Sequence, residues 1–166
     1  MQAYLATDRH TRECLLEMAA EYDEAALNRS FVNALFYDEP VGRFRDGYLF
    51  HSPPDLAAIR QDPENGSWDC DIAHENKLTW SDRVYKLFGL RTGVPVDRDW
   101  AVARYVDHSK AALDRVRKEA LRRNFGFILD AEIEPEGAGS RWIRVLAVPE
   151  LKDGRVVRLH GVKRSI

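Results

Sequence analysis

Residues from about 7 to 38 carry the hydrophobic spacing of an amphipathic helix. Apolar side chains recur every three or four positions, which places them on one face of a helix. This stripe consists of Leu15, Met18, Tyr22, Ala25, Ala26, Val32 and Leu35. Such a seam can pack on its own domain or on the same helix of a second copy, and the sequence leaves both open.

A break and a short helix are predicted next. Prolines and glycines punctuate residues 40–54, so this stretch is interpreted as a structured linker rather than a helix or strand. Ser52 or Asp55 is placed to cap a following helix, and Leu56 and Ile59 give that helix an inner face.

The period then changes to two, the spacing of a β-strand. Trp68, Cys70 and Ile72 alternate with polar residues and should share one buried side. A turn at residues 74–76 and a second strand at 77–80 complete a predicted β-hairpin.

Three helices are predicted after the hairpin, at about residues 81–89, 97–105 and 108–124. Ser81 is placed to cap the first helix and Gly89 to end it. The third helix has an apolar stripe on one side and basic residues on the other.

The last third returns to strands, at about residues 125–134, 141–149 and 155–163. Helices inserted between the second and third of five strands do not suit a parallel sheet. We therefore predict an α+β fold with a five-stranded antiparallel sheet, short helices on one face and an N-terminal helical extension. Residues 1–55 are assigned to the extension and linker, and 56–166 to the sheet domain.

Composition and charge mainly exclude certain classes of protein. Hydrophobic residues make up 45% and charged residues 31% of the 166 residues, as in globular domains. The net charge of -2, with dispersed basic residues, disfavours nucleic-acid binding. No apolar run approaches the about 20 residues of a membrane span, and the N-terminus lacks signal-peptide order. We expect a cytoplasmic protein that binds neither nucleic acid nor membrane.

The sequence contains no recognisable catalytic or metal-binding motif. A G-x-S-x-G element, a P-loop and an H-E-x-x-H helix are all absent. Cys14 and Cys70 have neither metal-ligand spacing nor the spacing of a redox pair. The chain is therefore interpreted as a binding domain and not an enzyme, with no metal site.

Four sequence blocks resemble those of PAS domains, in the subgroup with a bulky aromatic signature in its first strand. They are GSWDCDI at 66–72, LTWSDRVYKLFGL at 78–90, SRWIRV at 140–145 and DGRVVRLHGVKRSI at 153–166. Their order and spacing match the family over about residues 56–166. The resemblance implies a PAS fold and a stand-alone sensory domain, a bacterial regulator that signals through protein contact.

The resemblance also places a candidate ligand pocket between the inner sheet face and the short helices. Its residues are Trp68, Leu78, Trp80, Tyr85, Trp100, Tyr105, Phe127, Leu129 and Val145. The sequence names neither a ligand nor a cofactor for this pocket. Haem bound through His108 is not expected because this residue stands at a helix start. Covalent flavin chemistry is excluded because the Asn-Cys-Arg-Phe-Leu-Gln motif is missing.

A candidate protein interface joins the N-terminal stripe to the polar outer face of the sheet. Its residues are Leu15, Met18, Tyr22, Val32, Leu35, Arg144, Arg158 and His160, with Arg164 beside them. The expected partners are a second copy of the chain and a signalling protein such as a histidine kinase. The alternative is a dimerisation or interaction module whose core is fully packed and holds no ligand.

Overall fold

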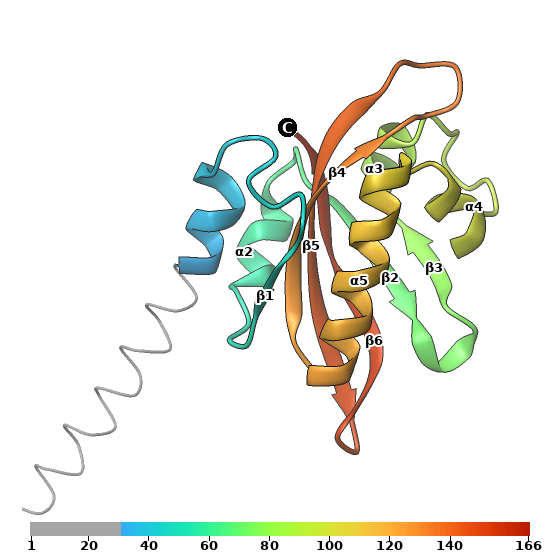
Figure 1. Ribbon diagram of the computed structural model, residues 1–166. Coiled ribbons are helices and arrows are strands. Elements are labelled where there is room, and N and C mark those ends of the chain that lie inside the picture. Colours follow the sequence, from blue (N-terminus) through green and yellow to red (C-terminus); the bar gives the residue numbers. More distant parts are fainter. Residues whose placement is uncertain (1–30) are drawn as a thin grey trace, which may run out of the picture.

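The structure is a computed structural model, and it describes residues 31–166 (Figure 1). Residues 31–38 are helical. The elements that follow are β1 (Tyr48–Phe50), α2 (Leu56–Gln61), β2 (Gly66–Asp71), the 3-10 turn η1 (Ile72–His74), β3 (Lys77–Trp80), α3 (Asp82–Leu87), α4 (Arg98–Ala103), α5 (Asp107–Arg123), β4 (Gly126–Ile133), β5 (Arg141–Lys152) and β6 (Arg155–Ser165). Within this range, no helix has the length and apolar character to cross a membrane.

One antiparallel sheet organises the fold, in the strand order β1-β4-β5-β6-β2-β3. The predicted α+β class is confirmed, but the sheet has six strands instead of five. The extra strand, β1, lies inside the stretch that was interpreted as a linker, and it pairs with β4. Gly47 turns the chain into β1 with a φ of 85°, and a Cβ atom there would lie 2.6 Å from Val116 Cγ2. Only glycine satisfies both conditions.

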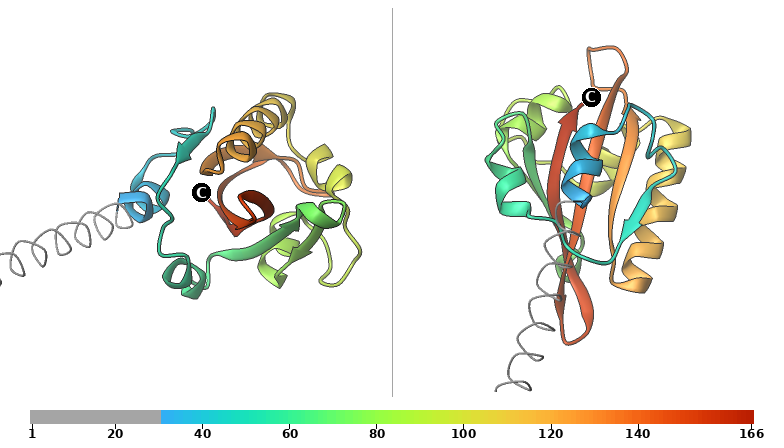
Figure 2. Two further views of the ribbon diagram at one scale, coloured as in Figure 1. Left: turned by 90° about the horizontal axis from the view of Figure 1, so that it is seen from below. Right: turned by 90° about the vertical axis from the view of Figure 1, so that its left-hand side faces the viewer.

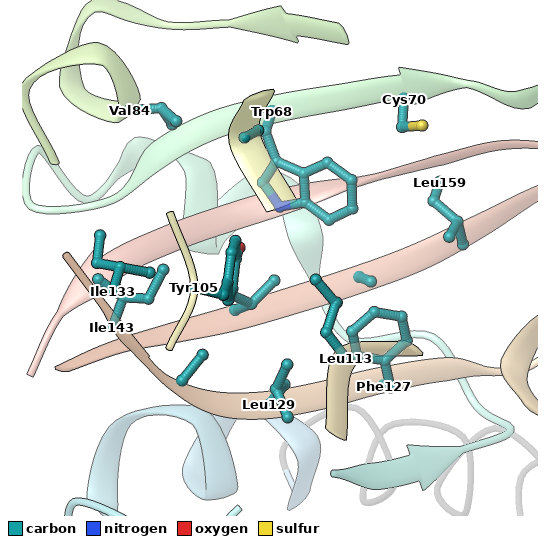
Figure 3. Close-up of a cluster of buried hydrophobic side chains, with 14 of the residues drawn as sticks. Trp68, Cys70, Val84, Tyr105, Leu113, Phe127, Leu129, Ile133, Ile143 and Leu159 are labelled. Atoms are coloured by element: carbon teal, nitrogen blue, oxygen red, sulfur yellow. The ribbon is translucent and has the colours of Figure 1, made fainter. Parts of the chain in front are cut away.

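The inner face of the sheet packs against α3, α4 and α5 and carries the larger core. Alternate strand residues point to this side, among them Phe127 and Leu129 of β4 and Val145 of β5. Trp68, Leu113 and Phe127 come from three different elements and point toward a common region (Figure 3). The aromatic rings of Trp80 and Phe88 stack beside it with centroids 4.7 Å apart.

The outer face is covered as well, which is one of the two packings that the sequence left open for the N-terminal stripe. The helical residues 31–38, the loop after them and α2 lie over it (Figure 2). Phe36 and Phe44 pack there against Ile128 and Leu146, and all four side chains are buried. The helices inserted between the second and third predicted strands were expected on one face, and residues 40–54 were interpreted as a linker, so no packed segment was assigned to the other face.

Local signals for helix ends succeeded in two of three cases. Asp55 caps α2, its carboxylate accepting from the Ala58 N–H at 3.2 Å. Gly89 follows α3 with a φ of 71°. Ser81 precedes α3 but makes no capping bond. Its hydroxyl oxygen accepts instead from the Ser67 N–H at 2.9 Å, which ties the start of α3 to β2.

Candidate functional site

A cavity of about 60 Å³ lies between the inner sheet face and helices α4 and α5. Its wall is mostly apolar, but three cationic side chains take part. The lining residues are Trp68, Cys70, Leu78, Arg98, Ala101, Val102, Tyr105, Leu113, Arg117, Phe127, Val145, Leu159 and Lys163. Because one water needs about 10–15 Å³ of such volume, the cavity has room for a handful of non-hydrogen atoms.

Lys163 is the most unusual member of this wall, because a lysine is rarely buried without a carboxylate partner. It lies on β6, shares the inner face with Leu159, and is only 7% exposed. Its ammonium lies 5.2 Å from the Trp68 ring centroid and 5.1 Å from that of Phe88, both within cation–π range. The ammonium donates a hydrogen bond to the Tyr105 hydroxyl oxygen at 3.2 Å.

Two arginines complete the cationic part of the wall. Arg98 begins α4, and Arg117 lies on α5 with its guanidinium donating to Asn76 Oδ1 at 2.8 Å. Burial, together with the positive charge of Arg98, lowers the pKa of Arg117. Burial raises the pKa of the neighbouring Cys70 thiol, which keeps that group neutral at pH 7. Cys70 therefore supplies no negative charge to the two arginines.

The predicted pocket residues divide into two groups. Trp68, Leu78, Tyr105, Phe127 and Val145 line the cavity. The other four lie in the surrounding core, where Trp80 contacts Phe88, Tyr85 packs edge-on against Trp80, Leu129 is fully buried, and Trp100 is partly buried under the Arg104 guanidinium.

Sequence reasoning missed the three cations. A signal for Lys163 was present, since it has the same strand parity as the inward Leu159. No comparable signal marked Arg98, which begins the short helix α4, or Arg117, which lies on a helix with several exposed basic residues.

The residues present do not suit the larger PAS cofactors. His108 lies outside the cavity, with its side chain 59% exposed and 3.7 Å from Glu132. The cavity is also well below the about 300–1,000 Å³ of ordinary ligand pockets. Among residues 31–166, no group of three or more His, Cys, Asp or Glu side chains is arranged to hold a metal ion.

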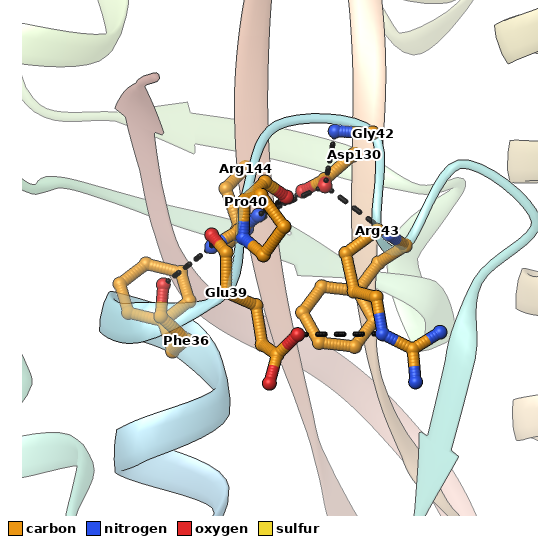
Figure 4. Close-up of polar contacts among 8 residues, drawn as sticks. Phe36, Glu39, Pro40, Gly42, Arg43, Asp130 and Arg144 are labelled. Carbon is orange, nitrogen blue, oxygen red and sulfur yellow. Dashed lines mark hydrogen bonds and ion pairs between the residues drawn. The ribbon is translucent and has the colours of Figure 1, made fainter.

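On the outer face, Arg144 and Asp130 form a buried ion pair that holds the N-terminal segment onto the sheet (Figure 4). Arg144 is 1% exposed and donates from Nε and Nη2 to the two carboxylate oxygens of Asp130, at 2.7 and 2.9 Å. Its remaining N–H groups donate to backbone carbonyl oxygens of Phe36, Glu39 and Pro40.

Asp130 completes this arrangement, which we call the Arg144 clamp. Its Oδ2 also accepts from the backbone N–H groups of Gly42 and Phe44, at 3.0 and 3.1 Å. All five guanidinium N–H groups of Arg144 thus have acceptors. Arg144 had been placed in a candidate protein interface on an open outer face. The structure instead buries it beneath the chain's own residues 36–44.

The other polar residues of the outer face also have partners within the chain. Arg158 pairs with Asp69 at 3.3 Å and with Glu150 at 3.5 Å. Arg164 pairs with Asp62 at 3.4 Å and lies over the Tyr37 ring. Both remain partly exposed.

His160 on the same face contacts Arg60 of α2. The Arg60 guanidinium donates to Nδ1 of His160 at 2.7 Å, so the neutral ring carries its proton on Nε2. Burial, and then the charge of Arg60, lower the pKa of His160 below its ordinary value of 6.5. The folded protein thus favours the neutral form.

This shift predicts a pH-dependent stability. The unfolded chain takes up a proton at His160 at a higher pH than the folded chain does, so stability is complete above about pH 6.5 and falls as the pH drops through the folded pKa. We expect urea unfolding of His160→Gln to lose less stability between pH 7.5 and 5.5 than wild type. His74→Gln is the control, since His74 is 78% exposed. Equal pH dependence in wild type and His160→Gln would contradict the prediction.

The N-terminal stripe is only partly described by the structure. Leu15, Met18 and Tyr22 lie outside the described residues. Val32 is 3% exposed and packs into the outer-face core, and Leu35 packs against the same core while partly buried. The last turns of the stripe therefore contact the chain's own sheet.

No protein-family model matches the chain, and neither does any curated protein. Solved structures do match it. An RNA-binding light-oxygen-voltage receptor aligns with a TM-score of 0.54 and 16% identity over 61% of this chain, and the match spans only 29% of that receptor. The N-terminal domain of a diguanylate cyclase with a PAS/PAC sensor from Marinobacter aquaeolei gives 0.53 and 15% over 61% of this chain and 94% of its own.

A sensory box histidine kinase/response regulator from Burkholderia thailandensis E264 aligns with a TM-score of 0.56 and 14% identity, over 66% of this chain and 82% of that chain. At these identities the similarity is one of fold alone. The described residues form a PAS domain fold, as the sequence blocks had indicated.

Proposed function

We propose that this chain is a non-catalytic sensory domain: a small molecule occupies the inner cavity, and the chain passes its state to another protein by direct contact. The observation that carries the proposal is the cavity with Lys163 in its wall. Burial of an unpaired charge is costly for a site that only packs a core. Ligand sites, by contrast, combine apolar walls with a few polar groups.

The signalling part of the proposal draws support from the similar structures. They include a histidine kinase/response regulator and a diguanylate cyclase sensor domain. We propose a histidine kinase or another cytoplasmic signalling enzyme as the partner, and a second copy of this chain as a further one.

One observation favours a second candidate function. The cavity of about 60 Å³ is small for a ligand site, and the stacked Trp80 and Phe88 rings fill the core next to it. A domain of this kind could serve as an interaction or dimerisation module that needs no ligand.

Native mass spectrometry of the freshly purified full chain tests the proposal. We expect a species that carries extra mass and loses it on denaturation, and the same spectrum counts the subunits. Hydrogen exchange of the loaded and emptied protein should then differ in α4 and α5, which form part of the cavity wall. A protein that is empty, and whose melting temperature no compound in a small-molecule screen shifts, would favour the interaction module.

A further inference from the structure

The charges around the inner cavity do not balance. Lys163, Arg98 and Arg117 all line it. Within residues 31–166, none of the three forms an ion pair with a carboxylate. Asp114 lies near Arg117 on α5, but it is exposed and pairs with Lys118 at 2.9 Å. Among residues 31–166, the three cations of the wall thus have no ion-paired carboxylate, and the nearby Asp114 is itself paired with Lys118.

Lys163 has unused hydrogen-bonding capacity as well as unbalanced charge. An ammonium group has three N–H donors, and the Tyr105 hydroxyl accepts one of them. The rings around the ammonium stabilise a cation but accept no conventional hydrogen bond. This contrasts with the Arg144 clamp, where every N–H of the buried guanidinium has an acceptor. Among the described residues, the other two N–H groups of the Lys163 ammonium thus have no hydrogen-bond acceptor, unlike those of the Arg144 clamp.

The apolar part of the wall restricts which anion would fit. Leu78, Val102 and Leu113 line the cavity together with the Phe127 ring. These side chains suit a carbon body and give nothing to a fully hydrated inorganic ion. The volume of about 60 Å³ is about four to six times what one water needs, which corresponds to a molecule of about four to six non-hydrogen atoms.

We propose that the inner cavity binds a small organic carboxylate, attracted by the positive charge that Lys163, Arg98 and Arg117 give to the wall, with its short carbon chain against the apolar side chains. This inference rests on the proposed sensory function and names the chemical class of its ligand. Carboxylates accept charge-assisted hydrogen bonds from ammonium and guanidinium groups, which are stronger than those between neutral groups.

Calorimetric titration of the full chain with acetate, propionate and butyrate tests the proposal. The matched neutral probes are acetamide, propionamide and butyramide, and sodium phosphate at equal ionic strength is the inorganic probe. We expect the carboxylates to bind and to raise the melting temperature, and the amides and phosphate to bind at least about tenfold more weakly, as expected for loss of a charge-assisted contact. Amides or phosphate that bind as tightly as the carboxylates would overturn the proposal.

Two variants with matched controls test the named cations. Lys163→Met keeps the apolar stem and should weaken carboxylate binding by about ten- to a hundredfold, whereas Lys77→Met, on the exposed edge strand β3, should not. If Lys163→Met fails to fold, Arg117→Gln is compared with Arg115→Gln, which alters an exposed residue of the same helix. Wild-type affinity in Arg117→Gln, and in Lys163→Met where it folds, would overturn the proposal.

The outcomes also separate this inference from the proposed function. A neutral molecule that is retained by the purified chain, with tight amide binding, would leave the sensory function standing and remove the carboxylate assignment. A chain that binds none of these probes, retains no molecule in the native mass spectrum and responds to no compound in the screen would remove both.

Discussion

Replacement of Arg144 with methionine is expected to lower the free energy of unfolding by about 3–5 kcal/mol, because it leaves Asp130 charged and buried without its partner. The loss should be large because three backbone carbonyl groups, of Phe36, Glu39 and Pro40, also lose their donor. Urea unfolding followed by tryptophan fluorescence measures the change.

Arg158→Met is the matched control for this prediction. Arg158 also lies on the outer face and forms two ion pairs, but its side chain is 42% exposed. Exposed pairs contribute about 0–1 kcal/mol, so this variant should remain close to wild type. An Arg144→Met variant as stable as Arg158→Met would mean that the clamp does not form in solution. A double variant with Asp130→Leu should lose less than the sum of the two single changes, because no buried charge is left unpaired.

Replacement of Phe127 with alanine should cost about 3–5 kcal/mol as well, for a different reason. The Phe127 side chain is 1% exposed and forms part of the cavity wall, so truncation removes buried apolar contacts and enlarges an existing void. Thermal and urea unfolding of the variant measure the loss.

Trp100→Ala provides the comparison for Phe127. Although both aromatic residues were assigned to the pocket from the sequence, Trp100 is only partly buried and its ring faces the Arg104 guanidinium at 4.9 Å. Its truncation should therefore cost less than that of Phe127. Equal losses for the two variants would show that Trp100 is packed as deeply as Phe127.

Much of the fold could be predicted because each element has a local signal. The alternation at Trp68 and Cys70 fixed the inner side of β2, and Asp55 and Gly89 marked helix ends. Strand β1 could not be predicted this way. It has only three residues, and its pairing with β4 depends on a turn at Gly47 that fits against Val116. The formation of β1 thus depends on contacts between residues far apart in the sequence, which no local pattern indicates.

The charged interior was the larger gap. Asp130 and Arg144 are direct partners in the β4–β5 register, but that register is not visible before the sheet is assembled. A lone arginine on a strand most often faces water, which made an open outer face the natural interpretation. Lys163 differs, because it lies an even number of residues from Leu159 on the same strand. The sequence alone therefore indicates that its side chain is on the inner side of β6.

The sheet is a single layer, and this has a mechanical consequence for β5. Arg144 and Val145 are consecutive residues on opposite faces, one in the clamp and the other in the cavity wall. One peptide bond joins them, so any displacement of that peptide moves both faces together. The backbone carbonyl groups that Arg144 holds begin at Phe36, within the helical residues that lead to the N-terminus. The cavity and the helical residues 31–38 are therefore separated by the thickness of a single strand.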